Sequence, residues 1–209
     1  MHQQIKLMLQ MQDEMNQKVN HDWRDKKREW YRAIWIECAE LMDHHGWKWW
    51  KKQANDIEQV QLEIIDIWHF GLSMLLESSN NQNKLADHIA DNFSNTSTSS
   101  TQLLEAVETF AGETLSTRTF STSKFKSLMD AAQMSVNDLY VGYVGKNTLN
   151  LFRQDFGYKD GSYIKEWAGK EDNEHLVEIT QELDVSALSF KDDLYNGLKN
   201  RYQSLTQTN

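Results

Sequence analysis

Proline is absent from this sequence of 209 residues, whereas average usage would give about ten prolines. Because proline removes a backbone donor and kinks helices, its absence permits long, unbroken helices. Cysteine occurs once, at Cys38, which excludes an intramolecular disulfide and favours a reducing compartment. Cys38 falls on the apolar side of a predicted helix, so we expect a buried thiol rather than a nucleophile.

Long apolar runs are also missing, and none approaches the roughly 20 residues that a membrane-spanning helix needs. The N-terminal residues show no signal-peptide pattern. Acidic residues predominate, since 31 Asp and Glu stand against 22 Lys and Arg, which gives a net charge of -9. Such a charge argues against a general nucleic-acid binder. We therefore expect a cytoplasmic protein that has neither a membrane nor a nucleic acid as partner.

Apolar residues recur at helical spacing along most of the chain, and no strand pattern of any length is present. Hydrophobic residues make up 39% of the sequence, and eight Trp and eight Phe suffice for a sizeable core. A short extended stretch is plausible only at 112–122. Ser135 and Asp138 form a capping-box pattern at the start of one predicted helix. The pattern predicts an all-α fold with helices at 3–20, 28–44, 56–77, 84–92, 102–110, 123–132, 135–154, 173–183 and 189–205.

Two polar stretches of low complexity interrupt the helical pattern, Ser78–Asn83 and Asn92–Thr101. Segments of this composition are flexible connections. We therefore expect a single domain over residues 1–209 that combines a rigid helical bundle with a smaller mobile helical part. The predicted core comprises residues 1–78 and 134–209, and the predicted mobile or variable insert comprises residues 79–133.

Two pairs of carboxylates lie on predicted helices, Glu37 with Glu40 and Glu63 with Asp66. Residues three apart are separated by about 60° around a helix, so the two members of each pair point in the same direction. Their neighbours on those helix faces are apolar, and acids on a core-facing stripe are costly unless a cation or hydrogen bonds compensate them. If the two helices pack antiparallel, the four carboxylates converge.

This convergence has two interpretations. The acids are either the solvated edges of amphipathic helices or the ligands of hard cations. Ligands that offer only oxygen suit Mg²⁺ or Mn²⁺. The spacing alone does not choose between the two interpretations.

Gln12 and Asn16 place two carboxamides on an otherwise apolar helical stripe near the N-terminus. Buried amides need hydrogen-bond partners. One interpretation is a polar pair that is satisfied within the core. The other is contact with a base, because a pyrimidine imide offers a donor between two acceptors, and a carboxamide can match it with two hydrogen bonds.

A segment rich in tryptophan and lysine, Trp47–Lys52, follows the helix that Gly46 is predicted to end. Its tryptophans can cap the core, or they can form the wall of a base pocket by stacking. His69 lies inside the next helix, where we interpret it as a packing residue rather than a metal ligand.

Basic residues outnumber acids between Gly145 and Lys170, although the chain as a whole is acidic. Lys146, Asn150 and Arg153 recur at helical spacing, so one helix face presents a cation, an amide and a guanidinium. These groups suit a polyphosphate, because Arg binds oxygens with two donors and Lys acts as a point charge. The alternative interpretation is a solvated basic face.

Several runs of sequence carry a family resemblance. They read I-E-C-A-E-L-M-D at Ile36–Asp43, W-K-x-W-K at Trp47–Lys51 and E-I-I-D-I-W-H-F at Glu63–Phe70, followed by Gly145–Tyr163 and Trp167–Asn173. The order E-x-x-E and then E-x-x-D is similar to the metal signature of the all-α nucleoside triphosphate pyrophosphohydrolases. Within that superfamily, these runs resemble the dimeric all-α dUTPases.

The resemblance implies hydrolysis of dUTP to dUMP and pyrophosphate, acceptance of dUDP, and a role in nucleotide-pool sanitation. It implies a homodimer whose active sites use two or more Mg²⁺ ions, in place of which Mn²⁺ would also serve. The implied metal ligands are Glu37, Glu40, Glu63 and Asp66. By position, either Glu37 or Glu40 would accept the proton of the attacking water as the catalytic base.

The resemblance also assigns substrate contacts. Gln12 and Asn16 match the uracil-contacting pair of the family, and the match at Trp47 and Trp50 favours a base-pocket role for at least one of these two tryptophans. The implied contacts with phosphate or sugar are Lys146, Asn150, Arg153, Tyr158, Lys159 and Lys165.

Two other functions remain open at this point. A pyrophosphohydrolase for another nucleotide such as dCTP would fit, because a carboxamide turned over presents the complementary hydrogen-bond pattern. A non-catalytic helical protein that binds nucleotide for regulation is the second alternative. The intact set of four acids argues against that second alternative.

Overall fold

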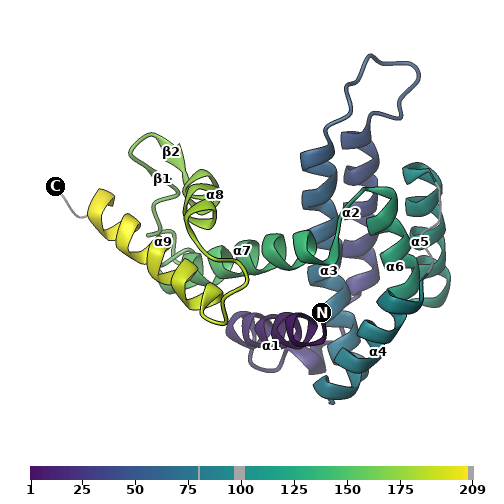
Figure 1. The fold of residues 1–209 in the computed structure, drawn as a ribbon, viewed down its shortest axis with the longest axis horizontal. Coiled ribbons are helices and arrows are strands. Elements are labelled where there is room, and N and C mark those ends of the chain that lie inside the picture. Colours follow the sequence, from purple (N-terminus) through teal and green to yellow (C-terminus); the bar gives the residue numbers. More distant parts are fainter. Residues whose placement is uncertain (80, 97–101, 207–209) are drawn as a thin grey trace. The chain divides into compact units, whose positions relative to one another are not determined.

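The structure is a computed structural model that describes residues 1–79, 81–96 and 102–206 (Figure 1). The chain forms two compact units, Met1–Tyr140 and Val141–Asn209, called unit 1 and unit 2 below. The all-α prediction is confirmed, although α4 and α5 extend further than expected. No helix in the described part of the chain is both long and apolar enough to cross a membrane. The elements in chain order are α1 (His2–Val19), η1 (Trp23–Lys26), α2 (Trp30–His45), α3 (Ile57–Ser78), α4 (Gln82–Asn95), α5 (Leu103–Thr117), α6 (Thr122–Ala131), α7 (Val136–Asp155), β1 (Glu166–Trp167), β2 (Lys170–Glu171), α8 (Asp172–Glu182) and α9 (Phe190–Thr206).

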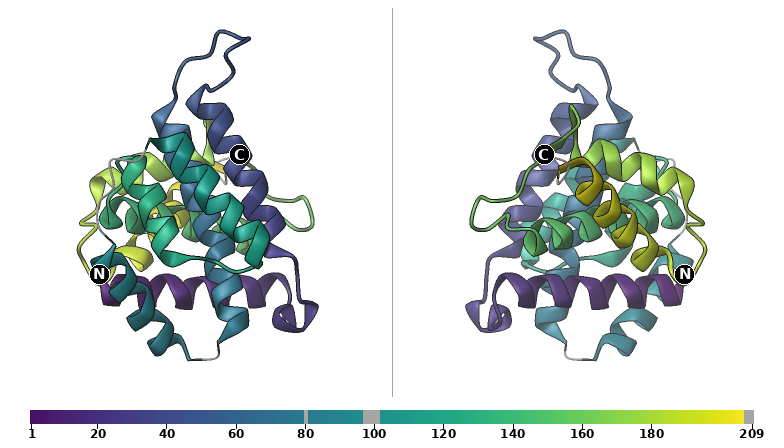
Figure 2. Two further views of the ribbon diagram at one scale, coloured as in Figure 1. Left: turned by 90° about the vertical axis from the view of Figure 1, so that its right-hand side faces the viewer. Right: turned by 90° about the vertical axis from the view of Figure 1, so that its left-hand side faces the viewer.

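Unit 1 is built around α2 and α3, which pack side by side in antiparallel orientation (Figures 1 and 2). Gly46 ends α2 with a φ of 82°, a left-handed conformation that favours glycine, as the sequence predicts. At the other end of the connection, the carboxylate of Asp56 accepts a hydrogen bond of 3.1 Å from the backbone N–H of Gln59. This cap fixes the start of α3.

Helix α1 lies across α3 and buries one apolar face against it (Figure 2). Ile5, Met8 and Leu9 are fully buried on this face. The indole Nε1 of Trp68 on α3 donates to the sulfur of Met8 at 3.3 Å. The same packing brings Gln12 and Asn16, on the C-terminal half of α1, against α3.

The predicted insert at 79–133 contains α4, α5 and α6, which pack within unit 1 against α1, α2 and one another. Trp68 of α3 stacks on Phe125 of α6, with ring centroids 4.9 Å apart and an interplanar angle of 13°. The insert lies wholly within unit 1, since the chain divides after Tyr140. The mobility of the insert stays a prediction. Residues 97–101 of the predicted connection Asn92–Thr101 lie outside the described residues.

The capping box predicted at the start of α7 is confirmed. The backbone N–H of Asp138 donates to Ser135 Oγ at 3.1 Å, and the backbone N–H of Ser135 donates to Asp138 Oδ2 at 2.9 Å. Two otherwise unsatisfied backbone donors therefore find partners at this helix end.

Unit 2 has an aromatic core. Phe152 of α7, Trp167 of β1 and Tyr202 of α9 meet edge to face, with ring centroids between 5.0 and 5.9 Å apart. His175 of α8 stacks on Trp167 at 4.8 Å, and its Nε2 lies 2.9 Å from the backbone oxygen of Trp167. These contacts hold the β1–β2 hairpin against α8 and α9.

The hairpin corrects one expectation from the sequence. The segment 112–122, where an extended stretch was expected, is the end of α5 and the connection into α6. The strands lie at Glu166–Trp167 and Lys170–Glu171, and Ala168 and Gly169 between them both have positive φ, 49° and 80°. Positive φ at both central residues is the geometry of a type I′ turn. Strands of two residues are too short to give an alternating pattern, so periodicity does not reveal them.

Candidate active site

Three carboxylates converge in unit 1, Glu37 from α2 and Glu63 and Asp66 from α3. One oxygen of each lies within 4.8 Å of the other two. Glu63 is 8% exposed, and Glu37 and Asp66 are partly buried. The antiparallel packing of α2 and α3 brings the acids of the two helices together. Three of the four predicted metal ligands therefore form one close group.

This crowding disfavours negative charge on Glu37. Burial, together with the charges of Asp66 and Glu63 and a hydrogen bond with Glu63, raises the pKa of Glu37 to about 8. A divalent cation at this point would compensate the repulsion between the carboxylates. Since the three acids offer only oxygen, the group fits Mg²⁺ or Mn²⁺ better than a softer metal.

Glu40 lies outside the close group. It is exposed on α2, one turn after Glu37. Among the described residues, the group of acids that could share one metal ion consists of Glu37, Glu63 and Asp66. The charge of Glu40 still contributes to the raised pKa of Glu37.

His44 is a neighbour of the acids that the sequence did not single out. Its Nε2 lies 3.4 Å from Glu63 Oε1, and its side chain is 37% exposed. The available signal was its position seven residues after Glu37, which returns to the same helix face. Cys38 is buried as expected, and burial raises the pKa of its thiol to about 12, with a further contribution from Glu37.

Gln12 and Asn16 are buried on α1 and hydrogen-bonded to α3. Gln12 Nε2 donates to Asn16 Oδ1 and to Ser73 Oγ, each at 3.1 Å. Asn16 Nδ2 donates to Ser73 Oγ at 2.9 Å, and His69 Nδ1 lies 3.0 Å from Gln12 Oε1. The two amides therefore have protein partners already, and contact with a base would exchange or extend these bonds.

Ser73 and His69 complete this polar group, although the sequence did not identify either of them as a partner of the two amides. His69 was expected to be a packing residue, and it is partly buried with a hydrogen-bond contact to Gln12. His69 and Ser73 lie three and seven residues after Asp66, so all three fall on one side of α3. This spacing was a signal that could have identified them.

Trp47 and Trp50 lie in the connection between α2 and α3. Their exposed fractions are 38% and 57%, and their rings meet edge to face with centroids 5.2 Å apart. Trp49 is 89% exposed and packs its ring against Trp50 at 5.4 Å. Gln53 ties the segment to α2, since its Nε2 donates to the backbone oxygen of Asp43 at 3.1 Å. These tryptophans thus present open ring faces and do not cap the core.

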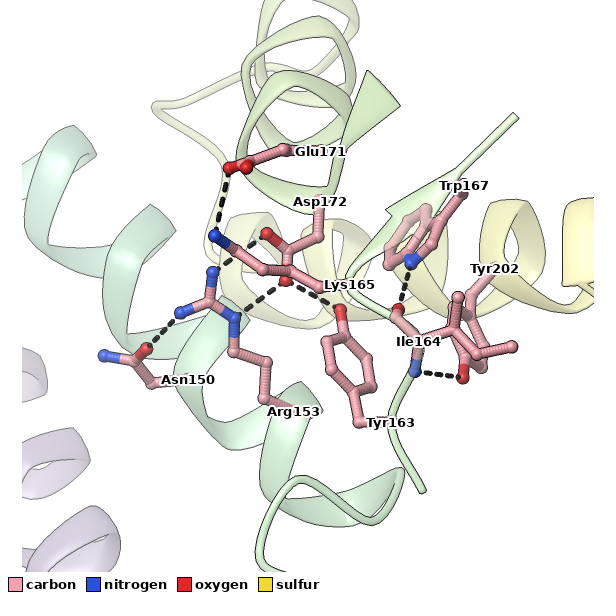
Figure 3. A network of polar contacts seen from close by, with 9 residues as sticks. All are labelled: Asn150, Arg153, Tyr163, Ile164, Lys165, Trp167, Glu171, Asp172 and Tyr202. Atoms are coloured by element: carbon pink, nitrogen blue, oxygen red, sulfur yellow. Dashed lines mark hydrogen bonds and ion pairs between the residues drawn. The ribbon is translucent and has the colours of Figure 1, made fainter. Parts of the chain in front are cut away.

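The residues predicted to contact phosphate belong to unit 2. Among them, Arg153 makes three side-chain hydrogen bonds. Arg153 donates from Nε and Nη2 to the two oxygens of Asp172, each at 2.8 Å (Figure 3). Its Nη1 donates to Asn150 Oδ1 at 3.3 Å. The helical spacing of Asn150 and Arg153 on α7 therefore produces a direct contact between them.

The other predicted contacts of unit 2 are more open. Tyr158 is 53% exposed and follows the end of α7, where its backbone N–H donates to the oxygen of Arg153 at 2.9 Å. Lys159 is exposed, and Lys146 is partly buried on α7. Lys165 forms an ion pair of 3.1 Å with Glu171, and both side chains are about half exposed (Figure 3).

The fold is all-α, and the acids of two antiparallel helices converge in it to offer a set of oxygen ligands of the kind that divalent cations prefer. A family model described as dUTPase matches residues 4–158. The chain belongs to the dUTPase family, and its activity is the hydrolysis of dUTP. No curated protein matches the sequence.

The matched range covers only part of the predicted site. It contains the four acids, the two amides, Trp47 and Trp50, and it ends at Tyr158. Lys159, Lys165 and the run Trp167–Asn173 lie beyond it. Their assignment depends on the sequence resemblance alone.

Proposed function

We propose that Glu37, Glu63 and Asp66, with Glu40 at their edge, hold the Mg²⁺ ions with which this dUTPase converts dUTP to dUMP and pyrophosphate. The observation that carries the proposal is the approach of three carboxylates to within 4.8 Å of one another. When bound, the cations would neutralise the triphosphate and lower the pKa of an attacking water. The proposal includes two or more ions, and Mn²⁺ would fit the same oxygen ligands.

Either Glu37 or Glu40 accepts the proton of the attacking water. The place of Glu37 within the close group of carboxylates supports Glu37, because a general base must lie within hydrogen-bond reach of the proton that it takes. Glu40 is exposed and at the edge of the group, which suits a ligand that moves in when substrate is present.

Recognition of the base is assigned to Gln12 and Asn16, with stacking by Trp47 and Trp50. The contacts with Ser73 and His69 support this assignment, because they restrict how the two amides can turn. A fixed amide distinguishes uracil from cytosine, since the wrong base would face a donor where it needs an acceptor. The half-exposed rings of Trp47 and Trp50 are open to stacking.

Contact with the phosphates and sugar is assigned to Lys146, Asn150, Arg153, Tyr158, Lys159 and Lys165. These groups would stabilise negative charge on the leaving side. The proposal also includes hydrolysis of dUDP, a homodimeric assembly and a cytoplasmic location. The single buried thiol, Cys38, supports a reducing compartment.

The test is pyrophosphate release from a panel of deoxynucleoside and ribonucleoside triphosphates, with and without Mg²⁺. We expect turnover with dUTP and Mg²⁺, and its loss in chelator. Glu63→Gln removes one charge with little change of shape, and it should lower kcat by at least about 100-fold. Glu58→Gln, an exposed position on the same helix, is the matched control and should stay within about twofold of the unaltered enzyme.

Two results would contradict the proposal. Undiminished turnover by a folded Glu63→Gln variant would remove the metal assignment. Faster release from dCTP than from dUTP would show that the amides select cytosine.

A further inference from the structure

Asp172 is a fully buried charged residue of unit 2, and the proposed function gives it no role. It begins α8, and its side chain is 0% exposed. Its Oδ2 accepts hydrogen bonds from Arg153 Nε and from the hydroxyl of Tyr163, each at 2.8 Å, and its Oδ1 accepts from Arg153 Nη2 at 2.8 Å (Figure 3). Its backbone N–H donates to the oxygen of Lys165 at 3.0 Å. One residue thus joins three positions of the predicted phosphate region.

The carboxylate of Asp172 remains ionised in spite of its burial. Burial alone would raise the pKa of Asp172, but the hydrogen bonds from Arg153 and Tyr163 outweigh it and the pKa lies below its usual range. The pairing also raises the pKa of Arg153, chiefly through the hydrogen bonds to Asp172. The pair therefore stays charged throughout the pH range of ordinary enzyme assays, and its geometry does not change with pH there.

The bidentate contact fixes the plane of the guanidinium. A guanidinium carries five N–H donors in a rigid plane. Two of them bind Asp172 and one binds Asn150, so within the described part of the chain one N–H on Nη1 and one on Nη2 are left for a further acceptor. Two adjacent N–H groups in one plane match two oxygens of a phosphate.

We propose that Asp172 is a positioning residue that orients Arg153, with Tyr163 as its second support, for contact with the polyphosphate of the nucleotide. This inference depends on the phosphate contact assigned to Arg153 under the proposed function. Asp172 lies outside the family match at residues 4–158, so its role follows from the contacts in this structure. The charge of Asp172 partly cancels that of Arg153, so its benefit lies in orientation and not in attraction of the anion.

The test is a double-mutant cycle on kcat/KM for dUTP, built from Asp172→Asn, Arg153→Gln and the double variant. A misplaced catalytic contact costs up to about 100-fold, so Asp172→Asn alone should lower kcat/KM by about 10- to 100-fold. The loss should fall mainly on kcat, because Arg153 keeps its charge and still attracts the triphosphate. In the Arg153→Gln background the same substitution should change kcat/KM by less than about threefold, since the group that Asp172 orients is gone.

A role in folding alone would give a different result. If Asp172 only stabilised unit 2, its substitution would lower activity by the same factor in both backgrounds, and that result would overturn the inference. A loss of less than about twofold for Asp172→Asn alone would overturn it as well. Melting temperatures of all variants show whether each is folded at the assay temperature. Glu178→Gln is the matched control on α8, because it also removes an acid that pairs with cations, Lys170 and Arg201, on an exposed surface.

A second variant covers the case in which Asp172→Asn does not fold. Tyr163→Phe removes one hydrogen bond to Asp172 and leaves the ring packing on Tyr202. It should lower kcat/KM by about 3- to 10-fold in the unaltered background and have no effect in the Arg153→Gln background. Equal losses in both backgrounds would overturn the inference. If Arg153→Gln leaves turnover unchanged, Arg153 does not contact the phosphates, and the inference about Asp172 is overturned with it. If the unaltered enzyme does not turn over dUTP at all, the proposed function itself is contradicted.

Discussion

Glu37 is the residue through which pH acts on the acidic group. In the folded protein without metal its pKa is about 8, compared with 4.5 for an ordinary glutamate. Between these two values the folded state keeps a proton that the unfolded chain has released. The stability of the metal-free protein should therefore fall as the pH rises through this window. A cation that binds the carboxylate displaces the proton, so metal binding should strengthen over the same window.

We expect the melting temperature of chelator-treated protein to fall between about pH 5 and about pH 8, and Glu37→Gln to remove most of that fall. Calorimetry over this pH range measures both. In the unaltered protein, a fixed Mg²⁺ concentration should raise the melting temperature more at the upper end of the window than at the lower end. Glu58→Gln should leave the pH dependence unchanged. An equal slope in Glu37→Gln and in the unaltered protein would show that Glu37 is not the titrating group.

The polar group on α1 and α3 consists of two amides that the sequence identifies and two partners that it does not. Gln12 and Asn16 were found in the sequence because two amides interrupt an apolar stripe. Ser73 and His69 were not assigned as their partners, because the identity of a partner depends on where α1 crosses α3. Hydrophobic periodicity predicts the buried face of each helix but not the crossing point of two helices.

At the scale of elements, the connection before α6 approaches α3 closely at Gly71, a residue that has no side chain. Gly71 is buried, and a Cβ added there would lie 2.3 Å from Phe120 Cε2. Phe120 is itself 7% exposed and packs between Trp68, Phe110 and Phe125, so its ring has little room to move. The glycine therefore allows a close approach that any larger residue would prevent.

We expect Gly71→Ala to destabilise the protein by about 1–3 kcal/mol, because the overpacking outweighs the better helix propensity of alanine. Gly112 on α5 is the matched control, since it is exposed and no heavy atom of the described residues outside the local backbone lies within 4 Å of an added Cβ. Gly112→Ala should stabilise by about 0.5–1 kcal/mol. Urea or thermal unfolding measures both changes. A stabilised Gly71→Ala would mean that Phe120 can move away at little cost.

At the scale of the whole molecule, unit 1 leaves large apolar side chains on its surface. Trp35 and Ile36 on α2 are 43% and 52% exposed, and Trp49 beyond the end of α2 is 89% exposed. Large apolar side chains that are exposed on the surface of one chain favour association between protein chains. Together with the resemblance to dimeric dUTPases, these residues support a homodimer.

We expect sedimentation equilibrium to give twice the chain mass of 24.5 kDa at micromolar concentration. Burial of apolar surface between two copies supplies the driving force, so dilution should be needed to observe the monomer. A mass of one chain at all concentrations would contradict the dimer. Repeating the measurement with dUMP and Mg²⁺ shows whether nucleotide binding strengthens the assembly.

The sequence by itself determined the helices and identified the acids that converge between α2 and α3. Helix periodicity, the glycine after α2 and the Ser135–Asp138 capping box are local signals, so each was readable without a fold. Glu37, Glu40, Glu63 and Asp66 were singled out because charge on an apolar helix face needs compensation. These inferences depend on residues within one or two helical turns of each other.

The tertiary structure decided which of these residues meet. It left Glu40 outside the close group, added His44 beside Glu63, and joined Arg153 to Asp172 across 19 residues of sequence. It also showed a hairpin with strands of two residues each, at a place where no strand was expected. Contacts of this kind depend on how helices rotate and cross when their apolar faces pack, and sequence periodicity does not contain that information.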